Sequence, residues 1–196
     1  MDVSQREDPL EILGRWLDEA RESGAEAPGA MTLATAGAGG APSARMVTLK
    51  RLEAGALVFT TALWTRKAEE LLANPRVAAV FYWPSLGRQV RIEGRGKVAE
   101  RDLAEELFAG RPRDHQLQAH TSRQGEEIES LDQLRSRLEA LRIELGNDPV
   151  PCPDDWGAIR LVPDRIEVWE EGPDRLHERR LFEADGDSWR QSLLAP

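Results

Sequence analysis

After residue 30 the spacing of apolar residues changes from that of a helix to the alternation of short strands, and this change limits the fold more than any other feature. Three segments, at 30–35, 43–52 and 56–61, alternate apolar and polar residues and are separated by short turns that contain glycine. Short alternating runs joined by such turns are typical of β-hairpins. Because a hairpin pairs neighbouring strands antiparallel, the sequence predicts an antiparallel sheet in this part of the chain.

More strands are expected further along, at 76–83, 88–99, 158–162, 165–169, 176–183 and 188–194. These are more short strands than one flat sheet needs, and their close spacing favours a closed antiparallel barrel with helices packed outside it. The expected fold class is therefore mainly β with peripheral helices, of the α+β type. No internal repeat or linker divides the chain, so we expect residues 1–196 to form a single domain.

Capping signals and helical spacing predict helices that begin after Asp8, at Thr65 and after Ser130, and two shorter ones at 100–109 and 112–122. The Thr65 side chain is expected to cap the second of the three capped helices. Glycines end the first and the last of the three, at Gly24 and Gly146. The last helix carries leucines on one face, at positions 131, 134, 138, 141 and 145.

Composition excludes several classes of protein. The formal charge of −9 argues against a nucleic-acid partner, because phosphate binding needs a basic face. No apolar run is long enough to span a bilayer, and the acidic N-terminal stretch does not resemble a secretory signal, so a cytoplasmic protein without a membrane partner is expected. The single cysteine, Cys152, excludes an internal disulfide and is interpreted as a packed or surface thiol. The three histidines are too scattered to predict a metal site.

Basic residues gather in four clusters although the chain is acidic. Only three of the 26 basic residues are lysines, and two of them, Lys50 and Lys67, lie in these clusters. Arg66 and Lys67 occupy the first turn of an expected helix, where cations oppose the helix dipole unless an anion lies nearby. The others are RMVTLK at 45–50, GRPRDHQ at 110–116 and DRLHERR at 174–180, whose Arg175, His177 and Arg179 alternate on one expected strand face.

Each cluster alone is most simply a solvated surface, because charged side chains are mostly exposed. Four of them together favour an anionic ligand with more than one charged end. No Ser-His-Asp order, HExxH or CxxC is present, so hydrolase and metalloenzyme functions have no support.

The clusters belong to a set of motifs that resembles a known family. In chain order these are RMVTLK, FTTALWTRKA, NPRVAAVFYW, GRQVRIEG, RPRDHQL, SRQ, IEVW and RLHERR. Their order and spacing resemble the pyridoxamine 5'-phosphate oxidases, FMN enzymes with a split β-barrel fold, over nearly the whole chain. The resemblance implies an antiparallel FMN-binding split β-barrel and a homodimer with FMN at the interface, where both subunits contribute to each site.

The resemblance also implies roles for individual residues. FMN would be bound by Arg45, Met46, Val47, Lys50, Thr60, Thr61, Arg66, Lys67, Gln89, Gln124, Trp169 and Arg179. A small phosphorylated or planar heteroaromatic substrate would contact Lys50, Arg111, His115, Arg175 and His177, of which Arg175 and His177 lie closest to the reacting carbon. The implied reaction is hydride transfer from the substrate to the flavin, followed by reoxidation with O2 to give hydrogen peroxide. Arg113 and Asp114 are expected to form a structural pair beside Arg111.

Several positions depart from the family pattern. Leu107, His115 and Gly125 stand where relatives carry hydroxyl side chains, and Trp64 replaces a small residue. Thr60 and Ala62 replace the usual Tyr and Asn, and a basic N-terminal lid is expected to be missing.

Three functions remain open. In the first, His115 replaces the lost hydroxyls and the enzyme oxidises pyridoxamine or pyridoxine 5'-phosphate. In the second, the pocket accepts another reduced substrate such as a dihydrophenazine-type compound, which Leu107 and Trp64 would suit. In the third, the protein binds flavin without turnover, although retention of the substrate cations argues against this.

Overall fold

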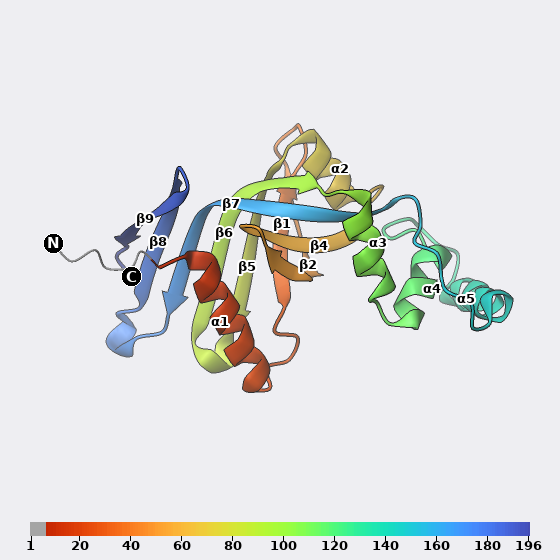
Figure 1. Cartoon of the computed structure of the whole chain (residues 1–196), viewed down its shortest axis with the longest axis horizontal. Coiled ribbons are helices and arrows are strands. Elements are labelled where there is room, and N and C mark those ends of the chain that lie inside the picture. Colours follow the sequence, from red (N-terminus) through yellow and green to blue (C-terminus); the bar gives the residue numbers. More distant parts are fainter. Residues whose placement is uncertain (1–6) are drawn as a thin grey trace.

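The core of the fold is one antiparallel sheet, shown in the computed structural model of the protein, which describes residues 7–196 (Figure 1). The expectations about a secretory signal, an N-terminal lid and the first residues of the domain concern residues 1–6 and lie outside this range. Along the sheet the strand order is β2-β1-β5-β6-β7-β4-β3, and β8 pairs with β7 and β9. The strands are β1 (Ala30–Ala36), β2 (Pro42–Thr48), β3 (Arg51–Glu53), β4 (Ala56–Ala62), β5 (Arg76–Trp83), β6 (Arg88–Val98), β7 (Trp156–Glu170), β8 (Glu178–Asp185) and β9 (Ser188–Leu193).

The sheet curls because its two end strands are successive parts of one segment. One strand was expected at 43–52, but the structure divides this segment into β2, which pairs with β1, and β3, which pairs with β4. The change of partner occurs at two residues: the Leu49 amide donates to the Gly29 carbonyl and the Lys50 amide to the Val58 carbonyl, both at 2.8 Å. The expected fold class is confirmed. The closure differs from the expected closed barrel, because no ladder joins β2 to β3 within residues 7–196 and the chain itself connects them.

β7 is a single strand of 15 residues where two were expected. The expected break falls at Pro163, which has no amide proton to donate to a ladder. The structure accommodates this proline at a β-bulge, where the register between β6 and β7 shifts after Glu93 and Gly94 lies opposite Pro163. β7 therefore runs on past the bulge and pairs with β4 in its first half and with β8 in its second half.

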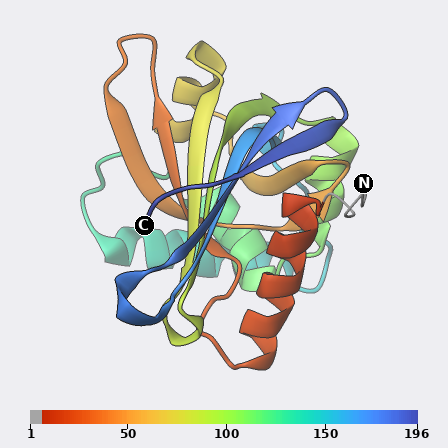
Figure 2. The same ribbon diagram turned by 90° about the vertical axis from the view of Figure 1, so that its left-hand side faces the viewer.

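Helix α1 (Pro9–Glu22) covers the sheet beside β5 and β6 (Figure 2). It begins as predicted, since the Asp8 carboxylate accepts a hydrogen bond from the Leu10 amide at 2.8 Å. Its apolar face is buried in the main core, which also contains the fully buried rings of Phe59, Phe81 and Phe182. Burial of such side chains stabilises the fold by about 1.5–3 kcal/mol each.

A helical layer lies at one end of the sheet (Figure 1). It comprises α3 (Arg101–Ala109), α4 (Arg113–Thr121) and α5 (Leu131–Leu145), and the last of these is capped by Ser130 as predicted. A small core of Phe108, Leu117 and Val150 joins these helices, and three of the predicted leucines of α5, at 138, 141 and 145, pack against it. Cys152 is a half-buried free thiol at the edge of the same core, as interpreted from the sequence.

Arg101 ties this layer to the start of β7. Its guanidinium group donates hydrogen bonds to the backbone carbonyls of Cys152, Pro153, Asp154 and Trp156 at 2.8–3.2 Å. Residues 151–155 belong to no helix or strand, so this side chain takes the place of a backbone partner. Trp156, the first residue of β7, is held in place by the same contact.

Helix α2 (Arg66–Ala73) packs near β1 and β6. Thr65 precedes it as predicted, but the Thr65 side chain makes no capping bond and donates instead to the Ala62 carbonyl at 2.8 Å. Two short 3-10 helices, η1 (Pro84–Leu86) and η2 (Pro173–Arg175), lie in the β5–β6 and β7–β8 connections. No helix within residues 7–196 is long and apolar enough to cross a membrane, and the expected cytoplasmic location stays a prediction.

Candidate active site

A cavity of about 340 Å³ lies where β2, β4 and α2 meet the helical layer. Nine of the residues that the resemblance assigns to cofactor or substrate line it: Met46, Val47, Lys50, Thr60, Thr61, Lys67, Arg111, His115 and Gln124. A second cavity of about 330 Å³ adjoins it and shares Lys50, Arg111 and His115. Leu107, one of the departures from the family pattern, lines this second cavity.

Arg111 is a half-buried cation with one buried, unpaired donor. Its guanidinium carbon lies 4.3 Å from the ring centroid of Trp156 and 5.5 Å from that of Phe108. Its Nη1 atom is buried and has no hydrogen-bond partner among residues 7–196, and the same is true of Nε1 of Trp156. Burial lowers the pKa of Arg111, which means that the fold disfavours its charge. Leaving a buried donor unpaired costs about 1–3 kcal/mol, so this position fits an incoming acceptor.

Lys50 reinforces this positive charge. Its pKa is lowered first by burial and then by the charge of Arg111. Two cations that repel each other at the rim of a cavity are stabilised together by a bound anion. His115, on the first turn of α4, is exposed and lines the same cavities. The residues present therefore fit a phosphate or carboxylate group.

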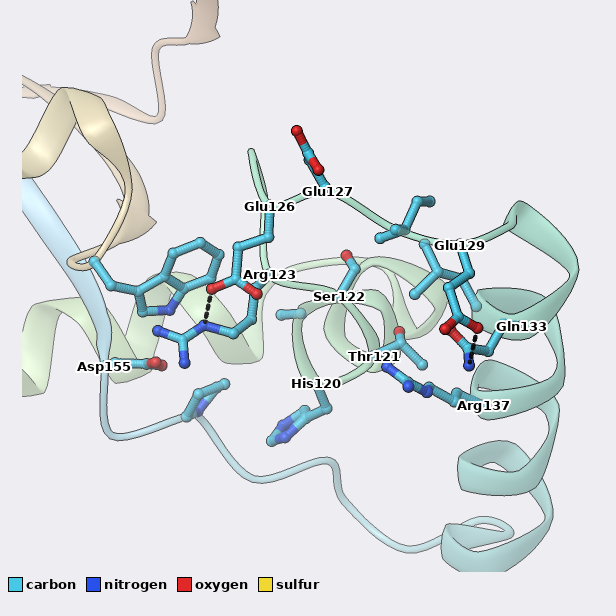
Figure 3. Close-up of a pocket in the computed structure, with 15 residues that line it drawn as sticks. His120, Thr121, Ser122, Arg123, Glu126, Glu127, Glu129, Gln133, Arg137 and Asp155 are labelled. Atoms are coloured by element: carbon cyan, nitrogen blue, oxygen red, sulfur yellow. Dashed lines mark hydrogen bonds and ion pairs between the residues drawn. The ribbon is translucent and has the colours of Figure 1, made fainter.

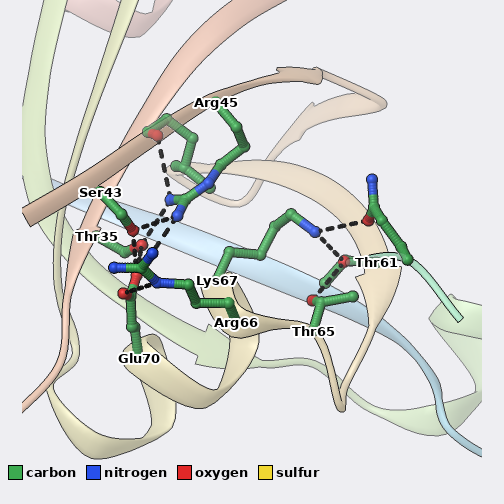
Figure 4. A network of polar contacts seen from close by, with 10 residues as sticks. Thr35, Ser43, Arg45, Thr61, Thr65, Arg66, Lys67 and Glu70 are labelled. Atoms are coloured by element: carbon green, nitrogen blue, oxygen red, sulfur yellow. Dashed lines mark hydrogen bonds and ion pairs between the residues drawn. The ribbon is translucent and has the colours of Figure 1, made fainter. Parts of the chain in front are cut away.

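Lys67 provides a second positive position in the first cavity. The residue is 9 % exposed, and its Nζ atom donates to Thr61 Oγ1 at 3.1 Å and to Gln124 Oε1 at 3.0 Å (Figure 4). Burial and the charge of Arg45 lower the pKa of Lys67. Within residues 7–196 it has no carboxylate partner, so its charge is balanced only by neutral oxygens. This arrangement fits a second anionic group.

Arg45 and Arg66 are held by a carboxylate that the sequence reasoning missed. Glu70, in α2, lies 2.8 Å from Arg66 Nε and 3.4 Å from Arg45 Nη2 (Figure 4). The expectation that Arg66 needs an external anion is weakened, because Glu70 already supplies one. The spacing of four residues between Arg66 and Glu70 is the signal that could have revealed this pair.

The remaining predicted residues form a separate group on the β7–β8 side of the molecule, and none of them lines the cavity. Gln89, Trp169 and Arg179 are direct neighbours across β6, β7 and β8. The ring of His177 lies 4.8 Å from that of Trp169. One chain therefore carries two groups of predicted site residues.

Arg175 and His177 do not lie on a strand, contrary to the expectation. Residues 173–175 form η2, and β8 begins only at Glu178. Asp174 and Arg175 have positive φ angles of 56° and 61°, which are unfavourable for residues other than glycine. Nδ1 of His177 accepts a hydrogen bond from the Gly172 amide at 3.3 Å. This strained turn presents the exposed Arg175 side chain to its surroundings.

The expected pairing of Arg113 with Asp114 is wrong. Arg113 donates to the carbonyls of Gly146 and Asp148, both at 2.7 Å, whereas Asp114 pairs with Arg142 at 3.0 Å. Both residues fasten α4 to α5 and the turn after it, since successive residues of a helix point in different directions.

A larger cavity of about 580 Å³ lies between α4, α5 and the loop that joins them (Figure 3). Trp64, Ala119 and Ser122 line both this cavity and the first one. The Arg123 guanidinium lies 4.8 Å from the Trp64 ring centroid and 3.0 Å from the Glu126 carboxylate. Trp64 and Arg123 thus form part of the boundary beside the candidate active site.

Comparison with known proteins decides the family. Residues 17–144 match the sequence model of a family described as pyridoxamine 5'-phosphate oxidase. The chain belongs to the pyridoxamine 5'-phosphate oxidase family. Residues 156–196 match a second model, described as the pyridoxine 5'-phosphate oxidase C-terminal dimerisation region. Trp169, His177 and Arg179, from the group of predicted site residues on the β7–β8 side, lie in this part of the chain.

Members of this family from several bacteria are similar to the chain over nearly its full length. The pyridoxine/pyridoxamine 5'-phosphate oxidase of Rubrobacter xylanophilus is 45% identical over 189 residues, which is 96% of this chain and 87% of that protein. The corresponding protein of Gluconobacter oxydans is 38% identical and covers 99% of this chain and 97% of its own length.

Solved structures show the same fold. PhzG from Burkholderia lata 383, in complex with tetrahydrophenazine-1-carboxylic acid, matches with a TM-score of 0.92 and 30% identity over 98% of this chain and 95% of that one. A pyridoxamine 5'-phosphate oxidase-related, FMN-binding protein from Nostoc punctiforme has a TM-score of 0.80 at 17% identity, with full coverage of both chains.

Membership of the oxidase family makes the protein an oxidoreductase. The family implies a flavin cofactor, and the C-terminal region indicates a homodimer.

Proposed function

We propose that the protein is an FMN-dependent oxidase that converts pyridoxamine or pyridoxine 5'-phosphate to pyridoxal 5'-phosphate. One observation carries this proposal: the buried, unpaired Nη1 of Arg111 beside Lys50 and His115, which together form a prepared site for a phosphate. Relatives named for this activity, up to 45% identical to the chain, support the same substrate.

FMN would be held in the part of the cavity near Lys67, and the substrate phosphate in the part near Arg111. Lys67 lines the cavity, and Arg45 and Arg66 lie beside it just outside the lining; all three would contact the phosphate and ribityl chain of FMN. Thr60, Thr61 and Gln124 would donate or accept hydrogen bonds around it. The positive charge that lacks a carboxylate at Lys67 supports this assignment.

Each active site would be completed by a second copy of the chain. Gln89, Trp169, Arg175, His177 and Arg179 do not line the cavity, so they would serve the site of the partner subunit. The match of residues 156–196 to a dimerisation region supports this arrangement.

When bound, FMN would supply the acceptor for the hydride that leaves the C4' carbon, and O2 would then take up the two electrons and two protons as hydrogen peroxide. With the amine substrate, water would hydrolyse the resulting imine and release ammonia. The chain's own residues bind and orient. Arg111, Lys50 and His115 fix the substrate phosphate, while Arg175 and His177 position the pyridine ring against the flavin. The Nδ1 atom of His177 accepts from the Gly172 amide, so in the neutral ring the proton lies on Nε2, which can donate to the substrate.

A second candidate function is oxidation of a reduced phenazine-type compound. The structure of PhzG with tetrahydrophenazine-1-carboxylic acid matches this chain with a TM-score of 0.92. Leu107 and Trp64 border the cavities and would contact an apolar tricyclic ring.

Anaerobic bleaching of the flavin separates these functions. The purified protein, loaded with FMN, is mixed without oxygen with pyridoxine 5'-phosphate, pyridoxamine 5'-phosphate or a dihydrophenazine carboxylic acid, and the flavin absorbance is followed. We expect rapid bleaching by the first two compounds and peroxide release when air is admitted. Bleaching by the dihydrophenazine alone would establish the second function. Bleaching by none of them would leave flavin binding without turnover.

A further inference from the structure

We propose that Glu70 is a positioning residue, which fixes Arg45 and Arg66 in the geometry that binds the flavin phosphate before the flavin arrives. This inference rests on the proposed FMN function and adds to it a residue that would not contact the ligand itself. Glu70 is almost fully buried, with a side chain 11 % exposed, at the junction of α2 with the β1–β2 hairpin (Figure 4).

The hydrogen bonds of Glu70 have a defined direction. Its Oε2 atom accepts from Thr35 Oγ1 at 2.6 Å and from Ser43 Oγ at 2.5 Å. An ionised carboxylate can only accept hydrogen bonds, so both hydroxyl protons must point toward it. Hydrogen bonds from Ser43 and Thr35 lower the pKa of Glu70 to about 2, and the group is therefore ionised at neutral pH.

This direction determines what the hydroxyls offer to Arg45. With their protons committed to Glu70, both hydroxyl oxygens present lone pairs on the other side. Arg45 uses them: Nη1 donates to Thr35 Oγ1 at 2.6 Å, and Nη2 donates to Ser43 Oγ. Thr35 and Ser43 are opposite each other in the β1–β2 register, so the carboxylate holds Arg45 through a pair of fixed hydroxyls.

Glu70 holds Arg66 directly. Its Oε1 atom accepts from Arg66 Nε at 2.8 Å, while 71 % of the Arg66 side chain remains exposed. A long exposed arginine samples many rotamers, and fixing one of them in advance removes part of the entropy cost of binding.

Charge alone makes the opposite prediction, which gives the inference a sharp test. Arg45 and Arg66 contact the Glu70 carboxylate and Lys67 lies beside them, so removal of the carboxylate would leave more positive charge for a phosphate. Simple Coulomb attraction then predicts tighter FMN binding without Glu70. Positioning predicts weaker binding, because a glutamine amide at this place can donate, and would turn the hydroxyls or Arg66 away from their present directions.

The test compares Glu70→Gln with Glu69→Gln, which removes the same formal charge from the exposed neighbouring residue of α2. FMN and riboflavin, which lacks the phosphate, are titrated into the flavin-free protein, and the quenching of flavin fluorescence gives each Kd. We expect Glu70→Gln to weaken FMN binding by about tenfold or more and to leave riboflavin binding nearly unchanged. Glu69→Gln is expected to change neither Kd by more than about twofold.

A second variant covers the case in which Glu70→Gln does not fold. Ser43→Ala keeps the carboxylate and removes one of the two hydroxyls that connect it to Arg45. We expect a loss of about threefold to tenfold in FMN affinity and none for riboflavin, with a cooperative thermal transition showing that the variant is folded.

Three results would overturn the inference. Unchanged or tighter FMN binding in the folded variants would show that charge, not position, is what Glu70 contributes. An equal loss of FMN and riboflavin binding would show a general structural role. If the unmodified protein binds neither flavin, the proposed function fails and the inference fails with it, whereas a loss of FMN affinity confined to the Glu70 and Ser43 variants supports both.

Discussion

Burial disfavours the charge of Arg111, as it does that of Lys50 and Lys67 in the candidate site. Two aromatic rings pack against its guanidinium group, and its Nη1 atom is buried without an acceptor. The charged guanidinium group destabilises the folded protein, and perturbed charges of this kind are typical of functional sites. A bound phosphate would supply the missing acceptor and the missing negative charge together.

Replacement of Arg111 by methionine should therefore separate binding from folding. Methionine fills a similar volume between the rings without a charge. We expect the KM for pyridoxine 5'-phosphate to rise about 10- to 150-fold, which corresponds to the roughly 1.5–3 kcal/mol of a charged hydrogen bond. FMN affinity should not change. Steady-state kinetics and flavin titration measure both, and Arg135→Met, at an exposed position of α5, is the control. An unaltered KM would remove Arg111 from the substrate site.

Lys50 makes substrate binding sensitive to alkaline pH. Burial and the charge of Arg111 lower its pKa below the ordinary 10.5. A bound phosphate favours the protonated amine, so affinity is constant below this lowered pKa and falls as the pH rises through it. In Arg111→Met the repulsion is gone, and we expect the fall to occur at higher pH. The Kd of pyridoxal 5'-phosphate, measured from pH 7 to 10.5, tests this, and a fall at the same pH in both proteins would contradict it.

Several residues that motif order singled out lie together in the structure, and their roles stay predictions. Lys50, Lys67, Arg111 and His115 lie around one cavity region, as expected from the motifs. Glu70 was missed because a glutamate on a short amphipathic helix is usually solvated, and only its packing against the β1–β2 hairpin buries it. Arg175 was wrongly predicted to lie on a strand because Arg175, His177 and Arg179 occupy alternate positions, which is also the pattern of one strand face.

At the scale of elements, the bulge between β6 and β7 lets a proline lie within a long strand. A Cβ atom built on Gly94 would lie 2.2 Å from the Val162 carbonyl oxygen and 2.8 Å from Cα of Pro163. Both neighbours are backbone atoms and cannot turn away. Glycine is therefore required here by close approach of the two strands.

Gly94→Ala should destabilise the protein strongly. We expect the free energy of unfolding to fall by about 3 kcal/mol or more, because the strands must separate at the bulge. Gly39→Ala, at a turn where an added Cβ meets nothing within 4 Å, should change it by less than about 0.5 kcal/mol. Denaturant unfolding of both variants gives the comparison. A cost below 1 kcal/mol for Gly94→Ala would mean that the bulge can shift to accept a methyl group.

Strand and helix periodicity predicted where most elements lie, but not where strands change partner. Nothing in the alternation of residues 43–52 marks Leu49 and Lys50, because the change depends on which strand lies on each side. Likewise Pro163 was read as a strand break, since the bulge that accommodates it is formed by a residue of β6, nearly 70 positions earlier. Both errors have the same origin: the pattern of neighbouring residues does not tell which distant strand a segment pairs with.

At the scale of the whole molecule, one chain carries two incomplete groups of site residues. One group, which includes Lys50, Lys67 and Arg111, lines the cavity. The other group, which includes Trp169, Arg175 and His177, lies on the β7–β8 side. In a dimer with twofold symmetry each group would meet the other group of the second chain, so two complete sites would form.

Mixing two inactive variants tests this arrangement. At a substrate concentration well below the KM of Arg111→Met, Arg111→Met and Arg175→Ala are each expected to lose most activity. If every site takes Arg111 from one subunit and Arg175 from the other, a mixed dimer has one intact site and one doubly defective site. Unfolding and refolding an equal mixture should then restore about a quarter of the unmodified activity, since half of the dimers are mixed and have one working site. No recovery, with mixed dimers shown by mass spectrometry, would place both residues in the same subunit's site.

Arg101 has a consequence for how the molecule opens. One guanidinium group binds four backbone carbonyls of residues 152–156, and the strand ladder begins only at Trp156, which pairs with Ala62. Free guanidinium ions can replace the Arg101 side chain at those four carbonyls, so the segment would loosen in dilute guanidinium chloride while the rest of the sheet is still intact. Trp156, and with it the packing of Arg111, would be released first. The binding function would thus disappear at a lower denaturant concentration than the fold, and more so in guanidinium chloride than in urea.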